Sequence, residues 1–449
     1  MDIDQEDASV NLGIENIFSA LSLNNLIIES EVLRDSINKV CSGNQNEEQI
    51  GLIAIRKFLS VDVRPPIQDV INTRIVPVLI RMSYDRPYEF AFEVCWILCN
   101  IGSGTTQHTK YLIDIGALDF FNDVFEYNTN SYKIKEQIVW AVGNIAGDCV
   151  EFRNLIQNSK ILQKILDFSL EMLEMKQLKI IENCVWALSN CVRGKPIPGK
   201  KIYDLTYGIF LKALLLINDE NTDIIWSLSY ITEFSSISNV FENTHLTKIV
   251  SLLDSSNIAT IIPSLRIFGN ISARVAESCK ILLPLGVLEK ILRLIRHEKK
   301  IVRRESFWTL SNMCSENNDV VCILLSTGGY QSILDEFDNQ DNEVSGEIIW
   351  TISNSFLSAD QFNIIKLFEI GWCHKFIELM KGQRVAKHKE TVVEGLIMIF
   401  NKCPNLLTYE LKQEILNIRE YSEGNISLSN KIEKLIKNIE ACKINQNYS

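Results

Sequence analysis

Aromatic and amide side chains recur in this chain as a fixed pair. At five places a tryptophan is followed four residues later by an asparagine, and residues four apart lie on the same face of an α-helix. An indole can hold the aliphatic stem and the charge of lysine or arginine, and an asparagine amide can donate to and accept from a peptide backbone. The five pairs are Trp96/Asn100, Trp140/Asn144, Trp186/Asn190, Trp308/Asn312 and Trp350/Asn354.

These pairs are spaced as the rungs of a ladder. The gaps between successive tryptophans are 44, 46, 122 and 42 residues, and the longest gap equals three periods of about 41. Trp226 with Tyr230, and Arg266 with Asn270, occupy the two missing positions. A period of about 40–47 residues in a helix-rich sequence is typical of armadillo and HEAT solenoids. We call these seven positions the ladder and each pair a rung.

A second repeat consists of glycines between apolar residues, at Gly116, Gly286, Gly328 and Gly371. Each follows a ladder position by a similar interval and suits the left-handed turn between two helices. One repeat is then a long helix that carries the rung, a polar turn, a shorter helix, the glycine corner and a third helix. Three helices per repeat indicate armadillo rather than HEAT.

We therefore predict an all-α fold, a right-handed superhelical solenoid of about nine or ten three-helix armadillo repeats. The sequence divides into an acidic N-terminal tail and capping helix (1–45), the repeats (46–403), and C-terminal capping helices with a tail (404–449). Caps are expected because the end repeats of a solenoid expose a face that inner repeats bury.

The composition narrows the classes of function. A net charge of −11 argues against nucleic acid as the main partner and favours a cationic one. The chain has neither a signal-peptide pattern at its start nor an apolar run long enough to span a membrane, and its 12 cysteines are scattered, so we expect a reducing compartment. Motifs for phosphate binding, metal binding or catalysis are missing, so we expect no enzyme, cofactor or metal.

The ladder allows two interpretations. Tryptophans at helical spacing are usually core residues, but recurring buried amides would each cost about 1–3 kcal/mol if left unsatisfied. Val142, Ile145, Leu188 and Leu310 already supply a separate apolar face. We therefore expect the ladder to be exposed, as parallel rows of indoles and amides along a concave groove that grips an extended basic peptide.

Five segments resemble the armadillo repeats of the importin-α family. They are EQIVWAVGNIAGD (136–148), ENCVWALSNCVRGKP (182–196), WSLSYITE (226–233), SLRIFGNI (264–271) and RRESFWTLSNM (303–313). The resemblance covers roughly residues 46–400 and includes the irregular rungs at Tyr230 and Arg266. It implies an adaptor that moves between cytoplasm and nucleus and binds mono- and bipartite nuclear localisation signals, which are lysine-rich clusters in cargo proteins.

The resemblance also implies two peptide-binding sites and an acidic stretch between them. The major site would comprise Trp96, Asn100, Gly104, Thr109, Trp140, Asn144, Asp148, Asn183, Trp186 and Asn190. The stretch between the sites would comprise Asp223, Trp226, Tyr230 and Glu233. The minor site would comprise Arg266, Asn270, Glu305, Trp308, Asn312, Glu347, Trp350 and Asn354.

Several of these residues have a plainer interpretation. Asp148 could cap the following helix, and Glu305 and Glu347 could be ordinary solvated helix residues. Arg266 could contact ligand or form a salt bridge between the sites. The basic cluster at 293–304 is interpreted as a solvated face.

The chain departs from the importin-α pattern at two places. Its first 55 residues contain only Arg34 and Lys39 as basic residues, so the family's basic importin-β-binding segment is expected to be missing, and neither autoinhibition nor the link to importin-β carries over. Ala276 stands where the family has an acid in the minor site. An export receptor for recycling remains an implied partner. The alternative function is an armadillo scaffold that uses the same groove outside nuclear import.

Overall fold

The structure, a computed structural model, describes residues 30–61, 63–127, 131–217, 221–234, 241–275, 277–315, 317–422 and 424–441. These residues form α-helices joined by turns and short 3-10 segments, with no strand among them. The all-α prediction is therefore confirmed. The predictions about residues 1–29 and about Ala276 concern positions outside the described residues.

The chain divides into two compact units, Met1–Ile217 and Asn218–Ser449. The first unit carries the rungs of the major site, and the second carries the remaining ladder positions. The described α-helices of the first unit are α2 (Glu31–Val40), α3 (Gln45–Leu59), α4 (Ile67–Asn72), α5 (Ile75–Met82), α6 (Tyr88–Gly102), α7 (Thr106–Asp114), α8 (Ala117–Tyr127), α9 (Tyr132–Asp148), α10 (Val150–Gln157), α11 (Lys160–Glu174), α12 (Leu178–Val192) and α13 (Lys200–Leu216).

The second unit continues the same pattern. Its described α-helices are α14 (Thr222–Phe234), α15 (Asn243–Leu252), α16 (Ile258–Arg274), α17 (Cys279–Leu282), α18 (Val287–Leu294), α19 (Lys300–Cys314), α20 (Asn318–Ser326), α21 (Gly329–Glu336), α22 (Asn342–Ser358), α23 (Gln361–Ile370), α24 (Trp372–Lys381), α25 (Lys389–Lys402), α26 (Tyr409–Asn417) and α27 (Ile426–Ala441).

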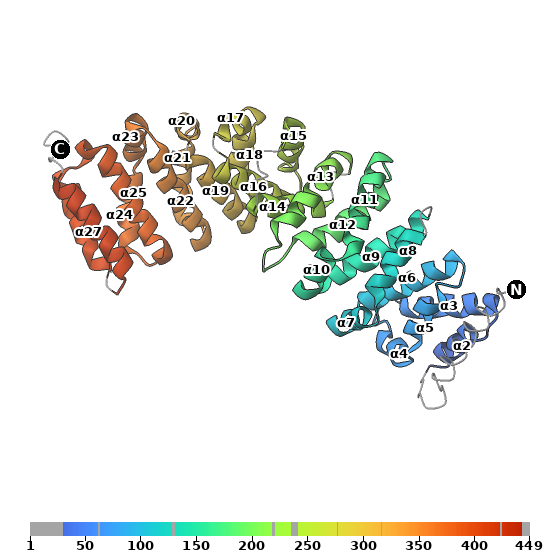
Figure 1. Ribbon diagram of the computed structural model, residues 1–449. Coiled ribbons are helices and arrows are strands. Elements are labelled where there is room, and N and C mark those ends of the chain that lie inside the picture. The colour runs from blue at the N-terminus through green and yellow to red at the C-terminus, as the bar shows by residue number, and fades with distance from the viewer. Residues whose placement is uncertain are drawn as a thin grey trace. The chain divides into compact units, whose positions relative to one another are not determined.

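The ladder helices are neighbours within each unit. In the first unit α3, α6, α9 and α12 pack in sequence, each against the next, and in the second unit α14, α16, α19, α22 and α25 do the same (Figure 1). Within its unit every rung therefore has another ladder helix on at least one side. This is the stacking of repeats that the period predicted.

The recurring glycines lie at turns between helices, as their spacing in the sequence predicted. Gly116, Gly286, Gly328 and Gly371 have φ of 79°, 77°, 69° and 108°, a region that side chains with a Cβ rarely adopt. Each ends the second helix of a repeat and begins the third. The apolar face predicted from Val142, Ile145, Leu188 and Leu310 is buried, as expected for the core between repeats.

Candidate functional site

The tryptophans of the first unit stand on three neighbouring helices and are open to solvent to different degrees. Trp140 on α9 is 49% exposed, whereas Trp96 on α6 and Trp186 on α12 are half-buried. In the second unit Trp350 on α22 is 42% exposed and Trp308 on α19 is half-buried. These five indoles thus keep accessible surface, as the exposed interpretation of the ladder requires.

The asparagines differ from that expectation, because their amides bind the neighbouring repeat. Nδ2 of Asn144 donates to the carbonyl of Cys99 at 3.2 Å, and Nδ2 of Asn190 donates to the carbonyl of Gly143 at 2.9 Å. In each case the acceptor is the residue just before the preceding asparagine of the ladder. In the second unit Asn270 and Asn354 donate in the same way to the carbonyls of Ser229 and Ser311, at 3.2 and 3.0 Å.

These bonds correct the prediction that the asparagines of the ladder are exposed. Asn190 is 2% exposed and Asn270 is 7% exposed, yet each has a carbonyl partner that offsets the loss of water. The asparagines therefore hold adjacent repeats in register as well as lining the ladder. The amide oxygen of Asn190 is buried and has no hydrogen-bond partner among the described residues.

Glycines make room for two of the indoles, a role that the sequence interpretation missed. A Cβ on Gly143 would lie 2.3 Å from the six-membered ring of Trp186, and a Cβ on Gly269 would lie 2.3 Å from that of Trp308. Each glycine directly precedes a ladder asparagine and faces the tryptophan of the next rung. The small residue before the asparagine was the available signal, because Cys99, Gly143, Gly269 and several serines recur there.

Two residues predicted for the major site, Thr109 and Asp148, lie on α7 and at the end of α9. The hydroxyl of Thr106 donates to Oδ1 of Asp148 at 2.8 Å and joins the two helices. Oδ2 of Asp148 and Oγ1 of Thr109 are buried and have no partner among the described residues. Thr109 stands one turn after Thr106 on α7, so the two unused oxygens belong to the same junction.

The plainer interpretation of Asp148 as a helix cap is not supported. The N-cap of α10 is Cys149, and no side chain caps that helix. Gly104, the other residue predicted here, is exposed in the turn between α6 and α7. A Cβ on Gly104 would lie 2.3 Å from Nδ1 of His108, which accepts the N–H of Thr105 at 3.1 Å and closes the first turn of α7.

Three residues that were not predicted, Arg56, Glu93 and Glu136, contact predicted residues of the first unit or each other. The guanidinium of Arg56 on α3 stacks over Trp96 at 4.3 Å from the ring centroid and pairs with Glu93 on α6. The predicted groove residue Asn183 donates to Glu136 at 2.6 Å. An arginine of the chain itself thus already uses one face of Trp96 as a cation platform.

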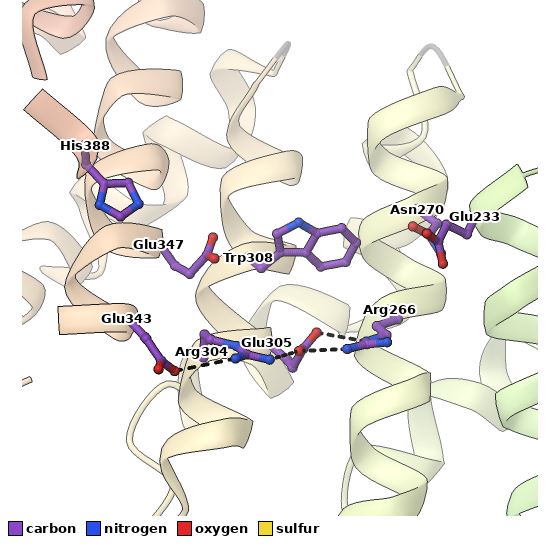
Figure 2. Close-up of a pocket in the computed structure, with 9 residues that line it drawn as sticks. All are labelled: Glu233, Arg266, Asn270, Arg304, Glu305, Trp308, Glu343, Glu347 and His388. Atoms are coloured by element: carbon purple, nitrogen blue, oxygen red, sulfur yellow. Dashed lines mark hydrogen bonds and ion pairs between the residues drawn. The ribbon is translucent and has the colours of Figure 1, made fainter. Parts of the chain in front are cut away.

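In the second unit five of the eight residues predicted for the minor site line a cavity of about 490 Å³, whereas Asn312, Trp350 and Asn354 do not (Figure 2). Glu233, Arg266, Asn270, Arg304, Glu305, Trp308, Glu343, Glu347 and His388 line it. We call it the second pocket. Five of these residues were predicted for the minor site, and Glu233 was predicted for the stretch between the sites. Arg304, Glu343 and His388 were not predicted for any site. The flanking Asp223, Trp226 and Tyr230 lie on α14, and the guanidinium of Arg266 lies 5.4 Å from the ring centroid of Trp226.

Arg266 forms the salt bridge that was one of its two predicted roles. Its guanidinium binds both carboxylate oxygens of Glu305 at 3.0 Å, and Arg304 adds a third bond at 2.8 Å. Burial works against ionisation of Glu305, but these bonds hold the pKa of its carboxyl below the ordinary value. Glu305 is 5% exposed, so its interpretation as a solvated helix residue is wrong.

Glu347 has the opposite character. Burial raises the pKa of its carboxyl to about 6, and the charge of Glu305 raises it further against a smaller opposing effect of Arg304. In the part of the chain that the structure describes, no donor reaches this carboxylate. A partly buried, uncompensated carboxylate beside an indole is an acceptor suited to a cationic side chain.

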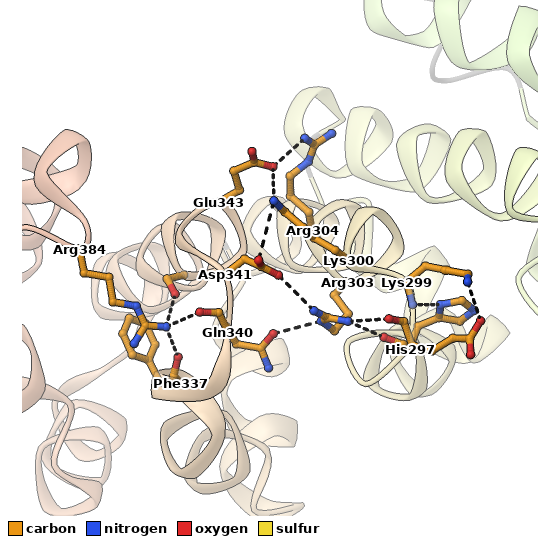
Figure 3. A network of polar contacts seen from close by, with 12 residues as sticks. His297, Lys299, Lys300, Arg303, Arg304, Phe337, Gln340, Asp341, Glu343 and Arg384 are labelled. Carbon is orange, nitrogen blue, oxygen red and sulfur yellow. Dashed lines mark hydrogen bonds and ion pairs between the residues drawn. The ribbon is translucent and has the colours of Figure 1, made fainter.

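The basic cluster at 293–304 is solvated in part, as predicted: Arg293, Arg296, Lys299 and Lys300 are exposed, whereas Arg303 and Arg304 are half-buried. Arg303 donates to the carbonyls of His297 and Glu298, both at 3.0 Å, and to Gln340 and Asp341 (Figure 3). Lys300 and Arg304 pair with Glu343. The acidic start of α22 thus pairs with the cations at the end of the cluster, whereas the other members face solvent.

The described residues show neither a helix able to cross a membrane nor a cluster of three potential metal ligands among histidine, cysteine, aspartate and glutamate. No family model matches the chain.

Curated relatives resemble the chain in sequence. Importin subunit alpha-1b of Oryza sativa subsp. japonica is 34% identical over 260 residues, 57% of this chain and 48% of the relative. Importin subunit alpha-1a of the same plant is 31% identical over 306 residues, 66% of this chain and 57% of the relative. Importin subunit alpha-5 of Arabidopsis thaliana is 30% identical over 70% of this chain and 60% of its own length. The chain spans about half the length of the curated relatives it matches.

Solved structures resemble the chain in fold. An engineered protein from a structural genomics consortium aligns with a TM-score of 0.74 at 16% identity, over 92% of this chain and all of its own. A structure from a study of the interaction between cadherin and beta-catenin aligns with a TM-score of 0.68 at 13% identity, over 91% and 94%. The resemblance predicted from the ladder is confirmed: this chain is an armadillo-repeat protein related in sequence to importin subunit alpha.

Proposed function

We propose that the chain is a nuclear import adaptor that binds extended lysine- and arginine-rich localisation signals along its ladder. The observation that carries this proposal is the junction of α7 and α9, where Asp148 and Thr109 hold two buried oxygens without donors beside three intact rungs. Buried acceptors without partners are costly, and a lysine ammonium with its three donors satisfies both.

The rungs supply the remaining contacts. The indoles of Trp140 and Trp186 stand on adjacent helices, so the stem of a basic side chain can lie between them and gain about 0.5–2 kcal/mol from the ring faces. The amide of Asn144, which is only half-buried, has spent one donor on the carbonyl of Cys99, and its oxygen can accept a peptide N–H. Side-chain charge and backbone polarity of the peptide are thus recognised separately.

The second pocket would hold a further basic cluster of the same kind of peptide. Its Glu347 carboxylate and the face of Trp308 offer an acceptor and a platform, whereas Glu305 is already neutralised by two arginines. Binding two clusters of one peptide would raise the overall affinity through effective concentration.

A peptide titration tests the first site. A lysine-rich peptide should bind the wild type, and Asp148→Lys should weaken binding at least tenfold, because about 1.4 kcal/mol or more of charge-assisted hydrogen bonding is lost. Asp167→Lys makes the same charge change at an exposed position of α11, a helix that carries no rung, and should bind like the wild type. Equal binding by all three proteins, or no binding by any, would refute the site.

A second experiment distinguishes the two candidate functions, nuclear import adaptor and scaffold. An import adaptor should carry a reporter bearing the peptide into nuclei of permeabilised cells, together with importin-β, and should itself be found in both cytoplasm and nucleus. Recycling would require an export receptor. A chain that binds the peptide but neither captures importin-β nor moves the reporter is a scaffold of armadillo type.

A further inference from the structure

The second pocket contains a histidine that neither the ladder nor the importin-α resemblance predicts. His388 is the N-cap of α25 and ends the segment between α24 and α25. Its imidazole packs on α22 at Gly346, where a Cβ would lie 2.4 Å from Cε1 and 2.6 Å from Nε2. Gly346 directly precedes Glu347, so the imidazole and the uncompensated carboxylate enter the pocket from neighbouring positions (Figure 2).

The segment before His388 is anchored, which fixes where the imidazole lies. Arg384 donates to the carbonyls of Phe337 and Gln340 and to the hydroxyl of Ser345, and its guanidinium lies 5.2 Å over the ring of Phe337 (Figure 3). Val385, the next residue, is 2% exposed. The imidazole is therefore a built part of the pocket wall.

The charged groups that line the second pocket together with His388 come from four helices. Glu343 and Glu347 belong to α22, Arg304 and Glu305 to α19, Arg266 to α16 and Glu233 to α14. Lys387 precedes the histidine on its own segment. Glu305 is held by the two arginines and Glu343 lies beside Arg304, so Glu347 is the carboxylate most open to a new cation.

We propose that the second pocket is a proton-gated cation site, in which His388 as an imidazolium competes with the ligand's ammonium or guanidinium for Glu347. This inference rests on the proposed function, because it concerns the same cationic ligand. At neutral pH the imidazole is uncharged and the carboxylate is available to the peptide. In acid Glu347 loses its charge and the imidazolium repels the ligand cation, so the pocket releases the peptide.

Both titrating groups act in the same direction. Burial, aided by Lys387, lowers the pKa of His388, so at pH 7.5 the imidazole is neutral. With a pKa of about 6, Glu347 falls from about 97% ionised at pH 7.5 to about 24% at pH 5.5, which alone weakens cation binding about fourfold. Protonation of His388 adds to this loss. Lysine side chains in the peptide keep their charge over the whole range.

Isothermal calorimetry of the full chain tests the gate. Asp148→Lys silences the first site, and an unlabelled lysine-rich peptide is titrated at pH 7.5 and 5.5. In this background the affinity should fall more than fourfold in acid. Adding His388→Gln should limit the fall to about fourfold, and adding Glu347→Gln should weaken binding at pH 7.5 and flatten the pH dependence. The matched control His374→Gln, an exposed histidine on α24, should keep the full fall.

A second measurement guards against a variant that perturbs folding. The Cε1–H resonance of His388, identified by its loss in His388→Gln among the chain's five histidines, should titrate at lower pH when the peptide is saturating, because binding and protonation are linked. An unchanged titration of this resonance, or an equal acid loss in the parent and His388→Gln, overturns the gate. Peptide binding to the wild type that vanishes entirely with Asp148→Lys removes the second pocket as a cation site while leaving the first intact. No binding to the wild type refutes the proposed function itself.

Discussion

Gly143→Ala probes the close approach of helix and indole on which the ladder depends. The new Cβ would lie 2.3 and 2.9 Å from two ring carbons of Trp186 and 3.0 Å from Cβ of Ala187, distances at which the ring or the helix must move. Overpacking of this kind destabilises by about 1–3 kcal/mol. Replacing a mid-helix glycine with alanine stabilises by about 1 kcal/mol, so the net effect is a loss of about 0–2 kcal/mol.

Gly208→Ala separates the two contributions. Gly208 also lies inside a helix of the first unit, α13, but a Cβ there meets nothing within 4 Å. This variant should gain about 1 kcal/mol, so urea unfolding should place the two variants about 1–3 kcal/mol apart. Displacement of Trp186 should also weaken binding of a basic peptide about 2- to 30-fold in Gly143→Ala only. Equal stabilisation by both substitutions, with unchanged peptide affinity, would show that Trp186 does not pack on Gly143.

Three further substitutions, one of them with a matched control, test the ladder and the second pocket. Asn190→Ala removes the donor to the buried carbonyl of Gly143 and should lower the free energy of unfolding by about 1–3 kcal/mol in urea. Glu305→Gln leaves Arg266 and Arg304 without their shared carboxylate and should lower the free energy of unfolding by about 1–3 kcal/mol. The control Glu343→Gln changes an exposed carboxylate and should stay within about 0.5 kcal/mol of the wild type. Equal effects of the two substitutions would contradict the buried pairing. The pKa of Glu347 is higher in the folded than in the unfolded chain. The protonated carboxyl therefore favours the folded state at low pH, and this contribution to the free energy of unfolding is lost as pH rises from about 4.5 to about 6. Glu347→Gln should therefore stabilise by about 1–2 kcal/mol at pH 7.5 and not at pH 4, which parallel denaturant titrations would reveal.

The fold could be predicted from the sequence because its main determinants are local. A W-x-x-x-N pair defines a helix face within one turn, and Gly116 or Gly371 needs only its own backbone to mark a corner. Their repetition at a constant interval supplied the stacking.

The chemistry between repeats could not be predicted in the same way. The bond from Thr106 to Asp148 joins residues 42 apart, and the bond from Asn190 to Gly143 joins residues 47 apart. No local rule fixes which atoms meet at such separations. The sequence indicated that an asparagine belongs on the ladder, but whether its amide faces solvent or a neighbouring carbonyl depends on how closely two helices approach. Glu305 shows the same limit, because its burial depends on Arg266 in the previous repeat.

Four of the six ladder asparagines make an amide-to-carbonyl bond whose place on the ladder does not depend on the length of the repeat. Donor and acceptor are 45, 47, 41 and 43 residues apart at Asn144, Asn190, Asn270 and Asn354. In all four bonds the acceptor is nevertheless the residue directly before the second residue of the preceding rung. Loops can thus gain or lose residues without shifting one rung against the next. Repeats joined in this way behave as interchangeable modules within a unit. An excision from one rung asparagine to the next would shorten the row of indoles by one step and leave its register intact.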